Sequence, residues 1–206
     1  MAEMVAGEVL WGQVPARDPE RALPLGMPAC RRMVAVTVRL PEFLLAASGL
    51  LQRLGAAGIR TDVLVAADSD ERADLAAGAA MERLRVPGLA RHRLALPVPI
   101  GADRADDLLA ALSELVGFDP EPGVYCMAPA ADGETPPGQS VSVVAEAARR
   151  IRKVYGLPLV RYSTTPTTDS TQIELATEEW ARKCEALAAC ATEVAPPNGY
   201  REYFGV

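Results

Sequence analysis

The chain of 206 residues contains a single histidine, and this scarcity excludes several kinds of active site. His92 stands between Arg91 and Arg93, and these flanking charges predict an exposed or strand-edge position. A metal centre that needs two or three histidines, including the His-Glu-x-x-His helix, cannot form in this chain. A Ser-His-Asp relay would have to recruit His92 itself.

Positive charge is also in short supply. The sequence has 21 Lys and Arg residues against 27 Asp and Glu residues, which gives a formal charge of −6 at pH 7. A chain of this sign offers no broad cationic field to nucleic acid or to an anionic membrane. We therefore expect a small-molecule ligand, with a protein partner or a second copy of the chain as a further possibility.

Long apolar runs and paired cysteines are missing as well. Residues 43–51 are far shorter than the roughly 20 residues of a membrane span, and residues 1–8 lack the features of a secretory signal. These absences predict a cytoplasmic chain without a membrane segment. The cysteines form no Cys-x-x-Cys pair, so we expect them to be reduced, with Cys126 buried in a strand. They are Cys30, Cys126, Cys184 and Cys190.

No glycine-rich phosphate loop is present. The first predicted strand runs into Val38-Arg-Leu-Pro-Glu-Phe, which lacks the glycines that bring backbone amides to the pyrophosphate of NAD or FAD. No Walker A motif occurs either, and we expect no cofactor. Gly138-Gln-Ser140-Val-Ser142 partly matches a nucleophile elbow, but Ser142 replaces the second glycine. A serine helix cap is the better interpretation of Ser140.

Hydrophobic patterning predicts alternating strands and helices. Such alternation indicates an α/β fold: a single doubly wound, mostly parallel sheet. Residues 1–32, rich in Pro and Gly, are expected to form an irregular N-terminal arm, and residues 33–206 the domain. Strands are predicted over residues 33–38, 61–67, 91–96, 124–128 and 159–162, and helices over 43–54, 70–85, 103–116, 140–155 and 174–192.

Ligands of such a sheet bind outside the C-terminal ends of its strands. Asp68 and Asp70 lie at one such end and could bind a cation or sugar hydroxyls, but an acidic first helical turn capped by Asp68 or Ser69 explains them better. Glu42 could be a solvated first-turn acid. Arg161 and Tyr162 could hold an anionic or polar ligand or simply end a strand.

Three stretches resemble, in order, the PIG-L/LmbE-like zinc-dependent N-deacetylases. Residues 33–71 (MVAVTVRLPEFLLAASGLLQRLGAAGIRTDVLVAADSDE) are similar to the family's opening strand, H-P-D-D-E loop, helix and second strand. Residues 124–150 (VYCMAPAADGETPPGQSVSVVAEAARR) are similar to its strand, loop and H-P-D-H-R-A-V helix. Residues 180–206 are similar to its closing helix and aromatic tail. The resemblance implies a Rossmann-like fold of this family.

The resemblance also implies that the zinc ligands are lost. Where the family has H-P-D-D, this chain has Leu40-Pro41-Glu42-Phe43, so Leu40 and Phe43 replace a histidine and an aspartate ligand. Glu42 stands at the catalytic aspartate. Ser140 aligns with the later histidine ligand, and Cys190 falls near the histidine of the closing helix. Because Leu and Phe offer no lone pair to Zn²⁺, no metal-activated water is expected.

Three functions remain open, and whether the chain is an enzyme is left open with them. The first is a metal-independent, repurposed family member that uses Glu42 for acid/base chemistry on an amino-sugar-like or specialised-metabolite substrate. The second is a pseudoenzyme that serves as a ligand-binding or partner subunit. The third is an N-deacetylase with relocated metal ligands among Asp68, Asp70, Cys126, Asp132 and Glu134. Expected substrate contacts are Arg39, Leu40, Phe43, Asp68, Asp70, Met127, Gln139, Ser140 and Arg161.

Overall fold

A computed structural model describes residues 24–27, 29–131, 139–190 and 201–205. In these ranges the chain forms one seven-stranded sheet in the order β3-β2-β1-β4-β5-β7-β6. The first five strands of that order run parallel, and β7 is antiparallel to both β5 and β6. The strands are β1 (Arg32–Thr37), β2 (Arg60–Ala67), β3 (Leu89–Leu96), β4 (Val124–Pro129), β5 (Leu159–Ser163), β6 (Thr171–Glu174) and β7 (Arg201–Gly205).

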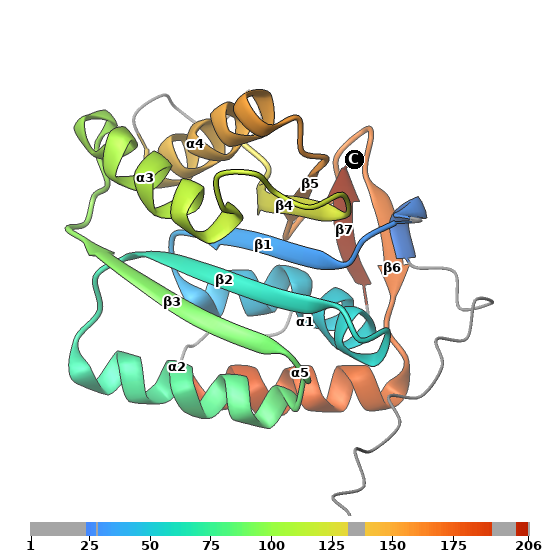
Figure 1. Ribbon diagram of the computed structural model, residues 1–206. Coiled ribbons are helices and arrows are strands. Elements are labelled where there is room, and N and C mark those ends of the chain that lie inside the picture. Colours follow the sequence, from blue (N-terminus) through green and yellow to red (C-terminus); the bar gives the residue numbers. More distant parts are fainter. Residues whose placement is uncertain (1–23, 28, 132–138, 191–200, 206) are drawn as a thin grey trace, which may run out of the picture.

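Helices cover both faces of this sheet, which confirms the predicted doubly wound α/β architecture. α1, α2 and α5 lie on one face, and α3 and α4 lie on the other (Figure 1). No helix in the described ranges has the length and apolar character needed to cross a membrane. The helices are α1 (Leu40–Ala56), α2 (Glu71–Leu84), α3 (Ala105–Val116), α4 (Ser140–Tyr155) and α5 (Thr177–Ala189), with 3-10 turns at Pro24–Gly26 and Ala102–Arg104.

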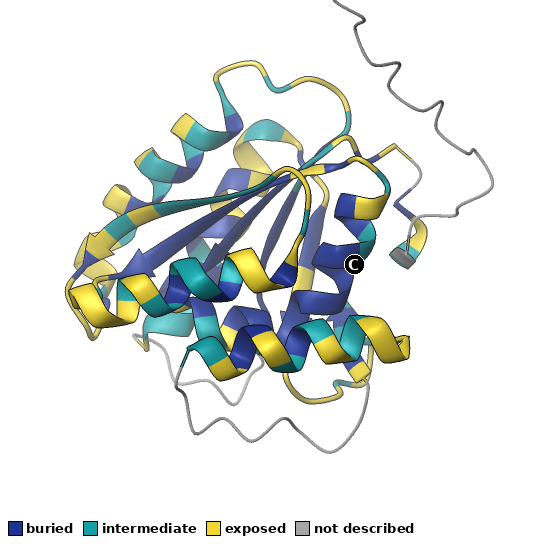
Figure 2. Cartoon of the chain, turned by 90° about the horizontal axis from the view of Figure 1, so that it is seen from below, coloured by how far each residue is buried: buried dark blue, intermediate teal, exposed yellow. Residues whose placement is uncertain are grey.

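The central strands are buried on both faces, as a parallel sheet under two helical layers requires. In β1, Met33 and Ala35 join the core under α1, whereas Val34 and Val36 join the core under α3 and α4. Figure 2 shows the inner strands as a buried band behind helices whose exposed residues face outward. Two apolar cores therefore sandwich the sheet.

Several predicted boundaries differ from the structure. The first helix begins at Leu40 instead of residue 43, because Pro41 stands in its first turn, where a missing N–H costs nothing. The helix predicted over residues 174–192 begins only at Thr177, since Glu174 ends β6, and residues 191 and 192 lie outside the described ranges. Strands β6 and β7 were not predicted. The arm predicted over residues 1–32 lies largely outside the described ranges, and Arg32 already belongs to β1.

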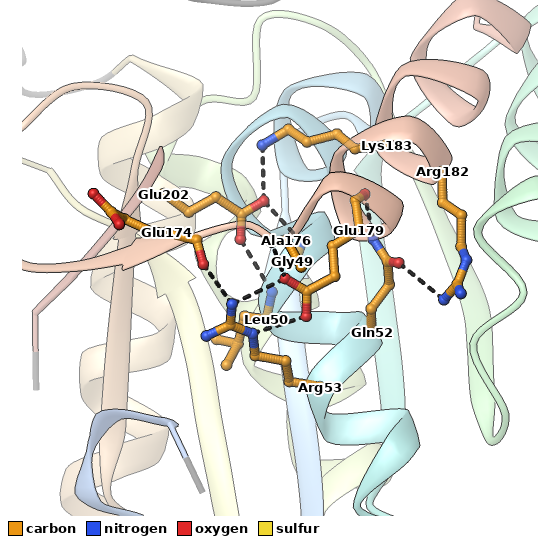
Figure 3. A network of polar contacts seen from close by, with 10 residues as sticks. All are labelled: Gly49, Leu50, Gln52, Arg53, Glu174, Ala176, Glu179, Arg182, Lys183 and Glu202. Carbon is orange, nitrogen blue, oxygen red and sulfur yellow. Dashed lines mark hydrogen bonds and ion pairs between the residues drawn. The ribbon is translucent and has the colours of Figure 1, made fainter. Parts of the chain in front are cut away.

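A buried ion pair attaches the last strand to the first helix (Figure 3). Lys183 of α5 places Nζ 2.7 Å from Oε1 of Glu202 in β7, and the two side chains are 1% and 0% exposed. The Glu202 carboxylate also accepts hydrogen bonds from the backbone N–H groups of Gly49 and Leu50 at 2.8 and 3.0 Å. Burial nevertheless raises the pKa of Glu202, against the lowering effect of Lys183. Each partner thus depends on the other to remain charged in the core.

A second ion pair extends the same connection toward solvent. Arg53 of α1 donates two hydrogen bonds to the Glu179 carboxylate, both at 2.9 Å, and one to the carbonyl of Glu174. Glu179 in turn accepts the backbone N–H of Ala176 at 2.8 Å, at the start of α5. Helix α1 therefore holds the end of β6 and the start of α5 as well as β7.

Substituting Gly49 tests how tightly this joint is packed. Alanine normally favours a helix interior over glycine by roughly 1 kcal/mol. A Cβ at Gly49 would instead overlap the buried side chain of Leu175 and approach Oε2 of Glu202 at 3.1 Å. We expect Gly49→Ala to lower the free energy of unfolding by about 1–3 kcal/mol, measured by urea denaturation.

The matched control lies in α2. A Cβ at Gly78 meets nothing within 4 Å, so Gly78→Ala should leave stability unchanged or raise it by up to roughly 1 kcal/mol. Equal effects of the two substitutions would contradict the packing described for Gly49.

Candidate active-site edge and arginine cleft

The C-terminal edge of the sheet has its topological switch point between β1 and β4. The chain leaves β1 toward β2 and later returns to place β4 on the other side of β1, which is the arrangement that leaves a crevice in open α/β sheets. Backbone contacts fix the neighbouring loops: the N–H of Ala67 donates to the Val38 carbonyl at 3.0 Å, and that of Asp68 to the Leu96 carbonyl at 2.7 Å. The first turn of α1 and the start of α4 flank this point.

Glu42 is the exposed acid of the first turn of α1. Partial burial raises the pKa of its carboxyl, while the charge and a backbone hydrogen bond of Arg39 lower it, and the net direction is upward. Arg39 is itself exposed, and its carbonyl accepts the Thr37 hydroxyl at 2.9 Å. The structure therefore brings two predicted site residues, Glu42 and Arg39, together at the strand end.

The residues beside Glu42 belong to the core. Leu40 and Phe43 are 2% and 0% exposed. The Phe43 ring meets Tyr162 of β5 edge to face at a centroid distance of 5.2 Å, and the Tyr162 hydroxyl donates to the Val36 carbonyl at 3.3 Å. Met127 is 0% exposed in the same core. These three predicted substrate contacts, Leu40, Phe43 and Met127, are closed to solvent in this structure.

The donor set does not fit the zinc ion that the resemblance implies. The positions aligned with ligands carry the side chains of Leu40 and Phe43, which have no lone pair. Within the described ranges, no three His, Cys, Asp or Glu side chains come together as a metal site requires. Cys126 is wholly buried in β4, and burial raises its pKa to about 12. Asp132 and Glu134 lie outside the described residues.

The two aspartates after β2 mainly shape the start of α2. Asp70, rather than Asp68 or Ser69, is the helix cap: its carboxylate accepts the N–H of Ala73 at 2.7 Å. Asp68 accepts the N–H of Ser69 at 2.9 Å and lies 3.7 Å from Arg93. Both aspartates are exposed at the sheet edge.

Ser140 is not a helix cap, so that prediction was wrong. The cap of α4 is the exposed residue Gln139, which makes no side-chain capping bond. The Ser140 hydroxyl instead accepts the N–H of Ile100 at 2.8 Å. It thereby attaches the loop after β3 to the start of α4, a contact between segments 40 residues apart that no local pattern indicates.

Arg161 lies on the other face of the sheet from Tyr162, because neighbouring strand residues point to opposite sides. There it lines a cleft of about 230 Å³ between α4 and the ends of β4 and β5, together with Arg149 and Arg152. Sequence reasoning missed both of these helix residues. Their spacing of three, in a helix rich in basic residues after residue 148, was the available signal.

Comparison with known proteins identifies relatives by fold only. No protein-family model and no curated protein matches the sequence. The conserved protein TT1542 from Thermus thermophilus superposes with a TM-score of 0.64 at 20% identity, over 84% of this chain and 93% of that one. A deacetylase of the teicoplanin biosynthesis pathway gives 0.58 at 15% identity, over 84% and 96%.

A third solved structure is the N,N'-diacetylchitobiose deacetylase from Pyrococcus horikoshii, with a TM-score of 0.58 at 12% identity over 85% of this chain and 75% of that one. The chain has the PIG-L/LmbE-like deacetylase fold. At these identities the likeness extends to the fold alone, so activity has to be argued from the residues described above.

The lone histidine lies away from this edge. His92, on edge strand β3 as predicted, has Nε2 3.0 Å from Oδ1 of Asp62, whose side chain is 0% exposed. Arg32 and Arg60 pair with the same carboxylate at 2.8 and 3.0 Å. Burial raises the pKa of Asp62, but the hydrogen bonds from His92, Arg32 and Arg60 outweigh it, and the net direction is downward. This cluster is a structural joint of β1, β2 and β3.

The pKa of Asp62 predicts how stability depends on pH. A carboxyl whose folded pKa is depressed stabilises the fold fully above its unfolded value, here about 3.8, and loses that contribution as pH falls through the folded pKa. Asp62→Asn should cost about 2 kcal/mol at pH 6, with a difference from wild type that shrinks below about pH 4. Urea denaturation across pH checks this.

Asp68→Asn is the control for that titration. The Asp68 side chain is 61% exposed, and its ion pair with Arg93 is long, at 3.7 Å. This substitution should change stability by less than about 0.5 kcal/mol. A pH-independent cost of Asp62→Asn would contradict the charged role of Asp62.

Substitutions of Phe43 test whether the position aligned with a zinc ligand lies in the apolar core or in a solvent-accessible site. Because Phe43 is 0% exposed, Phe43→Asp should bury an unpaired carboxylate and lower the free energy of unfolding by at least about 3 kcal/mol. Phe43→Leu should cost about 1 kcal/mol, the ring contact with Tyr162 being lost. If Phe43→Asp were as stable as Phe43→Leu, the position would be open to water like a ligand site.

Proposed function

We propose that the chain is a metal-independent protein of the PIG-L/LmbE-like fold that performs acid/base chemistry on a small polar metabolite at the C-terminal edge of the sheet. Glu42 is its proton-transferring group. The observation that carries the proposal is the pairing of an exposed Glu42, whose pKa is raised, with wholly buried neighbours at Leu40 and Phe43. The position aligned with the catalytic aspartate is still an acid, whereas the positions aligned with two zinc ligands, Leu40 and Phe43, are core residues.

A raised carboxyl pKa moves Glu42 toward the pH at which it can both accept and return a proton. Arg39 adds a cation beside it, so a polar or anionic group of the substrate could bind next to the acid. Without zinc there is no metal-bound water of depressed pKa. The chemistry expected here is therefore proton transfer to and from the bound molecule.

The substrate class is inferred from fold neighbours. Two of them are deacetylases, one in teicoplanin biosynthesis and one acting on N,N'-diacetylchitobiose. We infer an amino-sugar-like molecule or a specialised-metabolite intermediate. We also infer a reducing compartment such as the cytoplasm, because the sequence contains no Cys-x-x-Cys pair.

One observation favours a second candidate, a pseudoenzyme that binds a ligand or a partner. The contact of Phe43 with Tyr162 and the full burial of Leu40 close the part of the edge where the resemblance places two ligands. A protein that no longer catalyses a reaction can bury these two positions without losing its function. In this second function Glu42 would bind a ligand without transferring a proton.

The test is a turnover assay on N-acetylglucosamine and N,N'-diacetylchitobiose in the presence of EDTA, with products identified by mass spectrometry. Glu42→Gln should reduce turnover about 100-fold or more, the usual contribution of a general acid or base. Glu71→Gln is the matched control, because Glu71 is an exposed first-turn acid of α2 at the same edge.

The outcomes separate the candidates. Turnover that survives EDTA and is lost only in Glu42→Gln supports acid/base catalysis. Equal turnover by wild type and Glu42→Gln overturns the assignment of Glu42. Saturable binding of either sugar without turnover favours the ligand-binding pseudoenzyme.

A further inference from the structure

The arginine cleft, defined by Arg149, Arg152 and Arg161, has no role in the chemistry assigned to Glu42. It lies on the α4 face of the sheet, whereas Glu42 is in the first turn of α1, which lies on the opposite face (Figure 1). We propose that the arginine cleft binds the carboxylate or phosphate group of a small organic anion. This inference does not depend on the proposed function.

The cleft is lined by positively charged side chains and by a small set of apolar residues. Three of its eight lining residues are arginines, and among the described residues none of the lining is acidic. The remaining lining consists of Ala128, Pro129, Ala131, Ala145 and Leu159. The whole chain has a formal net charge of −6 at pH 7. The cleft is therefore a local cluster of positive charge on a protein whose net charge is negative. A group that stabilises three guanidinium ions together is an anion.

Two of the three arginines have no acidic partner in the described part of the chain. Arg149 pairs with Glu146 at 3.0 Å, and Glu146 is shared with Arg150 at 3.2 Å. For Arg152 and Arg161 the described residues provide no ion pair and no side-chain hydrogen bond to a carboxylate. Within the described residues, no ion pair therefore neutralises these two guanidinium groups. The two come from different elements, α4 and β5, and line the same space.

The side chain of Arg161 lies over Gly205 of the neighbouring strand β7. Arg161 and Gly205 are register partners in the antiparallel pair of β5 and β7. The guanidinium packs against Gly205, with Nη2, Cζ and Nε 3.1–3.4 Å from where a Cβ would stand. Any larger residue at position 205 would displace it. The small residue at position 205 thus leaves room for a planar guanidinium, whose fork of N–H donors matches a carboxylate or a phosphate.

The size of the cleft limits the ligand. Its volume of about 230 Å³ is below the roughly 300–1,000 Å³ of pockets that hold drug-sized molecules. The apolar part of the lining suits a short carbon skeleton attached to the anionic group. A dicarboxylate, a tricarboxylate or a small phosphate compound meets these requirements, and bidentate Arg contacts serve carboxylate and phosphate alike.

Calorimetric titration at low salt tests the proposal, with citrate as the carboxylate probe and pyrophosphate as the phosphate probe. Wild type should bind one of them saturably, with one molecule per chain. Arg152→Gln and Arg161→Gln should each weaken binding about tenfold or more, as expected for a lost charge-assisted contact. Arg150→Gln is the matched control: Arg150 lies on the same helix and pairs with Glu146 as Arg149 does, but it does not line the cleft.

Each result decides the matter. Binding that is lost in the two cleft variants and kept in Arg150→Gln supports the site, and the probe that binds identifies the anionic group. Equal losses in all three variants would show a net-charge effect and overturn it, as would the absence of saturable binding to both probes. Glu42→Gln should bind like wild type, so failure of the acid/base proposal is separable from failure of this one.

Discussion

The contact between Phe43 and Tyr162 determines which residues at the C-terminal edge of the sheet are buried. It joins the first turn of α1 to β5, and the Tyr162 hydroxyl reaches on to the Val36 carbonyl in β1. With Leu40 it makes the start of α1 part of the apolar core. A charged or metal-bound side chain at either position would lose this packing and its burial. Glu42 lies exposed between these two core residues, as the acid of the first turn of α1.

A second constraint fixes the antiparallel side of the sheet, where β7 lies beside β5. The buried pair of Lys183 and Glu202 connects α5 and β7 to α1 through the N–H groups of Gly49 and Leu50. Such a pair contributes little net stability but penalises any arrangement that separates its members. It specifies where β7 lies, and β7 in turn brings Gly205 under Arg161. The arginine cleft therefore depends on a joint in the other core.

The parallel part of the fold could be predicted because its strands are buried on both faces and its helices carry regular apolar spacing. The antiparallel strands could not: β6 has four residues with one buried side chain, and β7 depends on the burial of Glu202, a residue that composition would place in solvent. Glu42 and Arg39 were expected at a strand end, where they lie, whereas the catalytic role of Glu42 was implied by the family resemblance and stays a prediction. Ser140 was misassigned because its partner, Ile100, is distant in sequence. Arg149 and Arg152 were missed since a basic helix face is usually only solvated.

The metal content of the purified protein shows whether the chain works without a metal ion, as proposed. Elemental mass spectrometry would be applied to the protein as isolated, and again after incubation with zinc followed by desalting. We expect far less than one zinc ion per chain in both samples, because Leu40 and Phe43 are core residues without lone pairs. About one tightly held zinc per chain would contradict this expectation and point to relocated carboxylate or cysteine ligands.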